Sequence, residues 1–397
     1  MKVVLFILLL IIIWLILDFI LGRKNHLKRI IIRETPVLHG ELDIFPHGKE
    51  LFADYFAEIK QASKHVHVLF YIVKNDEFSR KFFDLLKEKA GQGVEVRLLL
   101  DRCGSIRVSR KLIAELTSAG IKFAFSNPIR FPWIFYSLQI RNHRKITVID
   151  GKIGYAGGFN IGKEYIDEAP KLSPWRDYHL KIYGEGVPFL QSEFLYDWKM
   201  SAGEDLFAKS SYFREQPRGT IRHRFLPTEA RGLEDNFINL IRLAQESIMI
   251  GTPYFIPSHN ILDELIKRVH DGVKITILVP KTPDHLLVQE ASYRYLRMLI
   301  KEGVQVYQFL HGFYHAKTIV IDEKICDVGT ANFDKRSLFL NKEINCYIYD
   351  RDFIARVKRV IEQDIKDSKK LTIEELNDVN LLVMIREYIA RAISFFL

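Results

Sequence analysis

HRKITVID (residues 143–150) and HAKTIVID (residues 315–322) are two copies of one pattern, and they decide the fold of this chain. Each copy has a histidine, a lysine two positions later and an aspartate at its end, with β-branched residues between them. Such a run is typical of a strand. Because the copies lie in different halves of a 397-residue chain, we predict that one folding unit occurs twice.

The segments before the two copies repeat the same order of structural patterns. The strand-like stretches KHVHVLFY (64–71) and VEVRLLL (94–100) flank a helical pattern in the first half, and SIMIGT (247–252) and VKITILV (273–279) flank one in the second. Strands that alternate with helical patterns indicate βαβ units with parallel strands. The predicted fold class is therefore α/β, with two duplicated lobes that each hold a mixed sheet flanked by helices.

The first residues predict a membrane span. An unbroken apolar run, VVLFILLLIIIWLIL (3–17), continues past Asp18 through residues 19–21. At 1.5 Å per residue, a helix over this stretch reaches roughly 28 Å, about the thickness of the hydrocarbon core of a bilayer. No small-x-small cleavage site follows, so we predict an uncleaved transmembrane helix. Asp18, near the end of the span, is expected to reach the interface without a further role.

The charge balance indicates an anionic partner. The chain carries a net charge of +9, which suits either nucleic acid or an anionic membrane. Basic residues cluster after the span with no acid before Glu34, so the positive-inside rule places the rest of the chain in the cytoplasm, at the cell membrane. Three cysteines without a C-x-x-C pair exclude a disulfide scaffold and a cysteine-rich zinc site. The clustered residues, which can also bind anionic headgroups, are Arg23, Lys24, Lys28, Arg29 and Arg33.

The composition divides the chain into five predicted parts. They are a transmembrane anchor (1–22), a basic juxtamembrane segment (23–39), a first lobe (40–205), a second lobe (206–367) and a C-terminal amphipathic helix (368–397).

The sequence does not decide the environment of two apolar segments. The C-terminal helix is assigned because Leu382, Ile385 and Ile389 recur at helical spacing. It could pack on the catalytic body or lie on the membrane, and the sequence favours neither. An aromatic cluster at residues 131–136 fits either an ordinary core or a belt at the headgroup level.

The motif places its side chains on two sides of a strand. Residues at i and i+2 share a face, so His143 and Lys145 project together, and the second copy does the same. The terminal aspartate lies an odd number of positions from the histidine and is expected to fix the strand from behind. An asparagine follows each histidine at the same distance. The predicted catalytic residues are His143, Lys145, Asp150, His315, Lys317 and Asp322, and the asparagines are Asn160 and Asn332.

An imidazole beside an ammonium group suits work on a phosphodiester. Breaking such a bond requires a nucleophile, a proton for the leaving alkoxide and positive charge around the phosphoryl oxygens. Two histidines can supply the first two, and two lysines with two asparagine amides can supply the third without a metal. Since a single copy would lack the acid, we predict that the two lobes face each other across one active site.

These motifs and their extensions, NHRKITVIDGKIGYAGGFN (142–160) and HAKTIVIDEKICDVGTANFDKRSLFLNKEIN (315–345), resemble the phospholipase D superfamily and, within it, bacterial cardiolipin synthases. The resemblance covers about residues 40–367 and the anchor. It implies a bilobed fold with the site on a pseudo-twofold axis, and no metal or other cofactor. It also implies that His143 forms a phosphatidyl-enzyme intermediate while His315 acts as acid and then as base, with the reverse left open by the near symmetry.

The resemblance extends to one acidic residue in each lobe. Glu343 matches the family acid that orients the opposing or the neighbouring histidine. In the first copy the same spacing falls on Lys171, so Asp177 in WRDYH is the expected counterpart. We expect these two acids to join Asn160 and Asn332 at the substrate-binding part of the site.

The predicted function is cardiolipin synthesis, in which the phosphatidyl group of one phosphatidylglycerol moves to a second and glycerol is released. Hydrolysis by the same fold, as in a phospholipase D that releases phosphatidic acid, is the main alternative. A nuclease and a non-catalytic membrane scaffold are less favoured, because of the anchor and the intact motif residues. The predicted partners are phosphatidylglycerol and an anionic membrane surface, with no nucleic acid and no obligatory protein partner.

Overall fold

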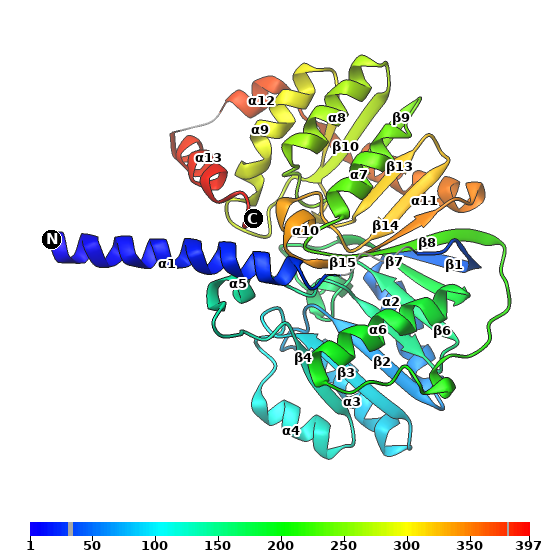
Figure 1. Cartoon of the computed structure of the whole chain (residues 1–397). Coiled ribbons are helices and arrows are strands. Elements are labelled where there is room, and N and C mark those ends of the chain that lie inside the picture. The colour runs from blue at the N-terminus through cyan, green and yellow to red at the C-terminus, as the bar shows by residue number, and fades with distance from the viewer. Residues whose placement is uncertain (31–34, 379–380) are drawn as a thin grey trace.

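The body of the protein consists of two lobes, each a sheet with helices on its faces (Figure 1). A computed structural model describes residues 1–30, 35–378 and 381–397, so Arg33 and Glu34 of the basic flank lie outside the described residues.

Both lobes use the same strand order from the molecular centre outward. The sheets of the two lobes join into one continuous sheet, because β1 pairs antiparallel with β8 at the centre. The predicted α/β fold of two duplicated lobes is therefore confirmed, with the difference that the lobes share a continuous sheet. The first lobe runs as β1 (Leu38–His47), β7 (Trp175–Gly184), β6 (Ile153–Gly157), β5 (Ile146–Ile149), β2 (His65–Phe70), β3 (Glu95–Asp101) and β4 (Lys122–Ser126), and the second as β8 (Ile221–Glu229), β15 (Lys342–Ile348), β14 (Ile325–Gly329), β13 (Thr318–Ile321), β9 (Ser247–Gly251), β10 (Lys274–Pro280), β11 (Gln305–Phe309) and β16 (Ser368–Lys370).

Helices cover the sheets as the alternating pattern predicts. β2, β3 and β4 are parallel to one another, and so are β9, β10 and β11. β2 buries every one of its residues, since a parallel strand is covered on both faces. The main helices of the first lobe are α2 (Gly48–Gln61), α3 (Glu77–Gly91), α4 (Arg110–Ser118) and α6 (Gly186–Ala202), and those of the second are α7 (Leu233–Arg242), α8 (His259–His270), α9 (Val288–Lys301), α10 (Lys335–Phe339) and α11 (Arg351–Lys366).

The chain just before each motif crosses to the opposite lobe. The short strand β12 (Phe313–Tyr314) pairs with β7 of the first lobe, at Trp175 and Arg176. In the other direction, Asn142 forms a β-bridge with Lys342, the first residue of β15. Each motif histidine therefore begins beside a strand of the lobe to which it does not belong.

The N-terminal helix α1 (Lys2–Leu27) projects from one side of the body with its apolar residues exposed (Figure 1). It is long and apolar enough to cross a bilayer. Near its body end, Oδ1 of Asp18 accepts a hydrogen bond of 2.8 Å from the backbone N–H of Tyr136, in the first turn of α5 (Ile134–Gln139). Asp18 is buried, so the expectation that it only reaches the interface is wrong. It holds the anchor on the body.

The C-terminal segment contains more than the predicted single helix. Its first residues form β16, and α12 (Ile373–Asn377) and α13 (Leu381–Ile393) follow. Glu387 of α13 pairs with Arg297 of α9 at 2.7 Å, so α13 packs on the second lobe through a polar side. Its apolar side is exposed, and it includes the predicted residues Leu382, Ile385 and Ile389.

Candidate active site

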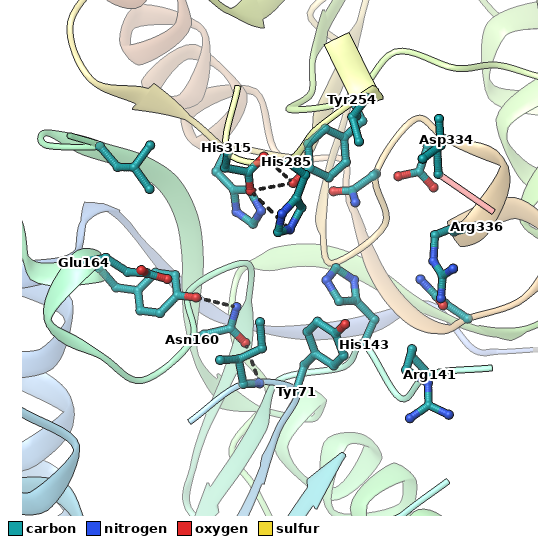
Figure 2. A pocket seen from close by; sticks show the side chains of 18 of the residues that line it. Tyr71, Arg141, His143, Asn160, Glu164, Tyr254, His285, His315, Asp334 and Arg336 are labelled. Carbon is teal, nitrogen blue, oxygen red and sulfur yellow. Dashed lines mark hydrogen bonds and ion pairs between the residues drawn. The ribbon is translucent and has the colours of Figure 1, made fainter. Parts of the chain in front are cut away.

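The two motif histidines meet in one pocket between the lobes (Figure 2). The pocket has a volume of about 350 Å³. His143 enters it just before β5 and His315 just before β13, and Asn160 and Asn332 line the same walls. The structure therefore brings together four residues that the sequence places far apart.

An acid of the second lobe holds the histidine of the first. Nδ1 of His143 lies 2.9 Å from Oε2 of Glu343 in β15. Three further side chains fix this carboxylate: Thr330 Oγ1 donates to it at 2.6 Å, Ser337 Oγ at 2.9 Å and Asn341 Nδ2 at 3.2 Å. With Nδ1 engaged, Nε2 is the ring nitrogen of His143 that remains for chemistry.

In the second half of the site the lobes are reversed: an acid of the first lobe holds the histidine of the second. Nδ1 of His315 lies 2.6 Å from Oδ2 of Asp177 in β7 of the first lobe. The backbone explains why, because the N–H of His315 donates to the carbonyl of Arg176 at 2.7 Å, and that of His143 donates to Lys342 at 2.9 Å. Each histidine therefore bonds through its backbone to the residue just before the acid of the other lobe, which brings that acid next to the ring.

These positions correct one expectation about the acids. Asp177 and Glu343 were predicted at the substrate-binding part of the site, but both side chains are 0% exposed and lie behind the histidines. A carboxylate bound to Nδ1 sets the tautomer and the orientation of the ring. We therefore describe both as positioning residues.

The two motif lysines are buried beside the histidines. Nζ of Lys145 donates to the carbonyl of His143 at 2.7 Å and lies 5.4 Å from the centre of the Tyr71 ring. Nζ of Lys317 lies 3.4 Å from Oδ2 of Asp177 and 2.5 Å from Nδ1 of His315. Burial, and then the nearby Lys317, lower the pKa of Lys145 to about 7. Burial also lowers the pKa of Lys317, against the pull of Asp177.

Burial makes both histidines weak bases in the free protein. It lowers the pKa of His143, although Glu343 opposes the shift. Burial and then Lys317 lower the pKa of His315 to about 4, although Asp177 opposes. Both imidazoles are therefore mainly neutral at pH 7. A neutral imidazole is the form that can attack phosphorus.

The two asparagines differ in what they leave free. Oδ1 of Asn160 accepts from the backbone N–H of Ile72 at 3.1 Å, which leaves its amide N–H groups for the pocket and for Tyr165. Oδ1 of Asn332 is buried and has no hydrogen-bond partner among the described residues. Because the Asn332 side chain also hydrogen-bonds to Asp334, it is Oδ1 that Asn332 leaves without a partner among the described residues.

The motif aspartates do not reach the pocket. Asp150 accepts hydrogen bonds from the backbone N–H groups of Ser63, Lys64 and His65, at 2.7–2.9 Å. Asp322 accepts three at 2.8 Å from residues 245–247. Both residues have positive φ, at 54° and 49°, a conformation that aspartate tolerates better than most residues. Their place among the predicted catalytic residues is therefore wrong, and the expectation that they fix the strand describes them.

Comparison with known proteins agrees with this geometry. A family model described as "Cardiolipin synthase, PLD-like domain" matches residues 55–169 and 237–365. The minor cardiolipin synthase of Bacillus subtilis is 39% identical over 400 residues, which cover 100% of both chains. The chain belongs to the cardiolipin synthase family.

Two further comparisons extend this result. The major cardiolipin synthase of Bacillus subtilis is 36% identical over 361 residues, which cover 89% of this chain and 75% of the relative. A crystal structure of the phosphatidylserine synthase of Haemophilus influenzae has the same fold, with a TM-score of 0.74 at 16% identity, over 95% of this chain and 100% of the other. As a member of the cardiolipin synthase family, the protein is a membrane-associated phosphatidyltransferase of the phospholipase D type that acts on phospholipid.

Three aromatic residues at the site were not among the predicted site residues. The ring of Tyr71 lies 4.9 Å from that of His143, and the ring of Tyr254 lies 6.4 Å from that of His315. The ring centroids of Trp175 and His315 lie 4.9 Å apart. Tyr71 directly follows β2 and Tyr254 follows β9. The ends of parallel strands commonly carry site residues, and the place of both tyrosines just beyond such a strand was the available signal.

Charged side chains line the pocket on both sides of the histidines. Arg141 and Arg336 lie on one side of the histidines and Glu164 on the other (Figure 2). Asp101 at the end of β3 holds Arg141 at 3.0 Å. Arg336 of α10 donates to the carbonyl of Gln139 at 2.8 Å. Asp334 lies on the side of the arginines (Figure 2), and Lys74, which also lines the pocket, pairs with Glu164 at 3.0 Å, so both sides carry charges of both signs.

Proposed function

We propose that this protein transfers the phosphatidyl group of one phosphatidylglycerol to the terminal hydroxyl of a second, giving cardiolipin and glycerol. One observation carries the proposal: two mainly neutral histidines, His143 and His315, share one pocket beside two buried ammonium groups, and the acid that holds each comes from the opposite lobe. The family membership supports the same reaction.

In the first step Nε2 of His143 attacks phosphorus. A P–N bond forms, and the bond from phosphorus to the glycerol oxygen breaks. His315 gives a proton to that oxygen, so glycerol leaves neutral. The incoming phosphodiester carries a negative charge, which favours a protonated His315 and two charged lysines at the moment they are needed.

In the second step the roles of the groups reverse. The terminal hydroxyl of a second phosphatidylglycerol gives its proton to His315, and its oxygen attacks phosphorus. The P–N bond breaks and neutral His143 is restored. Lys145, Lys317 and the amides of Asn160 and Asn332 stabilise the charge on the phosphoryl oxygens in both steps.

The same proposal places the enzyme in the cell membrane, as a single-pass protein with its body on the cytoplasmic side. α1 supplies a span of suitable length and hydropathy. Arg23, Lys24, Lys28 and Arg29 follow the apolar run, which favours a cytoplasmic position for what comes next. Phosphatidylglycerol is an anionic component of such a surface and would be both neighbour and substrate.

Purified full-length protein with phosphatidylglycerol in mixed micelles tests the reaction. A chelator is present, and lipid products and free glycerol are measured together. We expect cardiolipin and glycerol in equal amounts. Phosphatidic acid as the main product would replace synthesis by hydrolysis, and cleavage of DNA without lipid turnover would reject both.

The role of each histidine needs a separate measurement. Phosphatidylglycerol labelled in its phosphatidyl group is mixed with the protein, which is then denatured quickly and examined for a labelled histidine. We expect the label on His143, and none in His143→Ala. A labelled protein that survives His143→Ala but not His315→Ala would reverse the assignment.

A further inference from the structure

A second hollow lies against the body end of the anchor. One face of α1 from Phe19 onward, together with Lys28 just after its end, forms one wall, and Arg231 and Phe395 form the other. We call this hollow the loading groove. It is open, with a volume of about 710 Å³, and it begins where the apolar run of α1 ends.

The loading groove combines apolar and basic side chains. The described residues that line it include no aspartate and no glutamate. Long apolar side chains next to cations at the end of a membrane span match the acyl chains and the phosphate of an anionic phospholipid. The apolar residues are Phe19, Ile20, Leu27 and Phe395, and the basic ones are Arg23, Lys24, Lys28 and Arg231.

Two adjacent phenylalanines separate the loading groove from the catalytic pocket. Phe395 lines the groove, and Phe396 lines the pocket that holds His143 and His315. The ring of Phe19 in α1 contacts both, with centroid distances of 5.7 Å and 5.2 Å. We call Phe395 and Phe396 the partition.

The partition and the anchor are held in place by named contacts. Nη1 of Arg336 donates to the carbonyl of Phe396 at 3.0 Å. Nδ1 of His26 lies 2.7 Å from the hydroxyl of Tyr136, on the helix whose backbone Asp18 also binds. Because α1 is fixed to α5 at two points, the loading groove is a built part of the body.

We propose that the loading groove binds an anionic phospholipid from the bilayer and that this lipid passes the partition to reach the catalytic pocket. The path is continuous in its chemistry. Basic residues line both ends of this route, since Lys24 and Lys28 line the groove and Arg336, which holds Phe396, lines the pocket. The proposal that this lipid is the substrate rests on the proposed function, whereas binding in the groove does not.

Binding is tested first, on the full chain in the His143→Ala background so that no turnover intervenes. Phe395→Trp places a fluorophore in the loading groove, and vesicles carry brominated acyl chains on either phosphatidylglycerol or phosphatidylcholine. The protein without Phe395→Trp corrects for the native tryptophans. We expect stronger quenching of the new fluorophore by the phosphatidylglycerol chains than by the phosphatidylcholine chains.

The basic residues of the loading groove should cause that preference. Lys24→Gln with Lys28→Gln should weaken it by roughly tenfold or more, since each charge near the surface adds to the attraction. The matched control removes the same charge from α11, on the far side of the body (Figure 1), by Arg359→Gln with Lys366→Gln. Equal quenching by both lipids, or an equal loss in the control, would overturn the proposal.

Passage past the partition is tested by kinetics. Phe396→Trp enlarges the ring between the groove and the pocket. We expect kcat/KM for long-chain phosphatidylglycerol in vesicles to fall by roughly tenfold, which corresponds to about 1.4 kcal/mol. Soluble dihexanoyl phosphatidylglycerol can enter from water, so its kcat/KM should fall at least about threefold less than that of the long-chain lipid, even though Phe396 also lines the pocket.

The outcomes separate this proposal from the proposed function. An equal loss with both substrates, or no loss with either, would reject the route past the partition. If the unsubstituted protein forms no cardiolipin from either substrate, the proposed function fails, while the quenching result still decides whether the loading groove binds anionic lipid.

Discussion

The two half-sites have the same scaffold and different surroundings. In both, an aspartate at the end of the motif strand accepts three backbone N–H groups, and an acid from the opposite lobe binds Nδ1 of the histidine. The first half-site holds His143 beside one aromatic ring, with a carboxylate fixed by three hydrogen-bond donors. The second packs His315 among Trp175, Phe313 and Tyr254, with Lys317 in contact with the ring.

This difference suggests how a duplicated site acquires two roles. A rigid carboxylate that receives several donors fixes the tautomer of His143, which suits a nucleophile. His315 is enclosed and lies against a cation, and its pKa is lowered to about 4. Its protonation therefore depends on the charge of the bound phosphodiester, which suits a group that must give and then take a proton.

The largest expected effect comes from removing either histidine. His143→Ala and His315→Ala should each reduce cardiolipin formation by at least about 10⁴-fold, because each is needed in both steps. Turnover is measured with phosphatidylglycerol in mixed micelles, and folding by thermal melting. His270→Ala, an exposed histidine on α8, is the matched control. Activity within tenfold of the unsubstituted protein in either variant would mean that the half-sites work separately.

The exchanged acids should have the next largest effect, and an unequal one. Glu343→Gln and Asp177→Asn keep the shape of each side chain but remove its charge, and we expect kcat to fall by roughly 10²- to 10³-fold. The loss should be larger for Asp177→Asn, because that carboxylate also faces Lys317. The ratio of the two kcat values is the measurement. A change of less than about threefold in both would show that the exchange does not position the rings.

The pH dependence should separate the free enzyme from the substrate complex. In the free enzyme the pKa of Lys145 is about 7, so as pH rises through this value a positive charge is lost and kcat/KM should fall. A bound phosphodiester favours the ammonium form, so the same limb in kcat should lie at higher pH. Because the pKa of His143, the nucleophile, is lowered, the loss of kcat/KM on the acidic side should begin only below about pH 6.5. If kcat and kcat/KM fell at the same pH on the alkaline side, this explanation would be contradicted.

The smallest effect on activity is expected from the motif aspartates. Asp150→Ala leaves three N–H groups without an acceptor, of which only that of His65 belongs to a buried residue, and it should lower the free energy of unfolding by about 1–3 kcal/mol. Asp322 is more exposed, so Asp322→Ala should cost about 1–2 kcal/mol. Denaturant unfolding measures both losses. The kcat of the folded fraction should stay within about threefold of that of the unsubstituted protein. A much larger fall would show that these aspartates take part in catalysis.

The sequence by itself determined the repeated motif strand, the side of that strand on which each residue lies, and the apolar anchor. The reason is that strand period and hydropathy are local properties. His143 with Lys145 on one side and Asp150 behind could therefore be predicted without a structure. The family resemblance added Glu343 and Asp177 but left open which histidine each acid serves.

Only the tertiary structure decided the exchange between lobes, the role of Asp18 and the meeting of the anchor with the C-terminal segment. Asn142 pairs with Lys342, and Tyr314 with Arg176, and no local pattern specifies such distant backbone partners. Asp18 looked out of place in an apolar helix until the backbone N–H of Tyr136 gave it a partner. Side chains of this kind take their role from groups that lie far away in the sequence, because burial and hydrogen bonding depend on which surfaces the fold brings together.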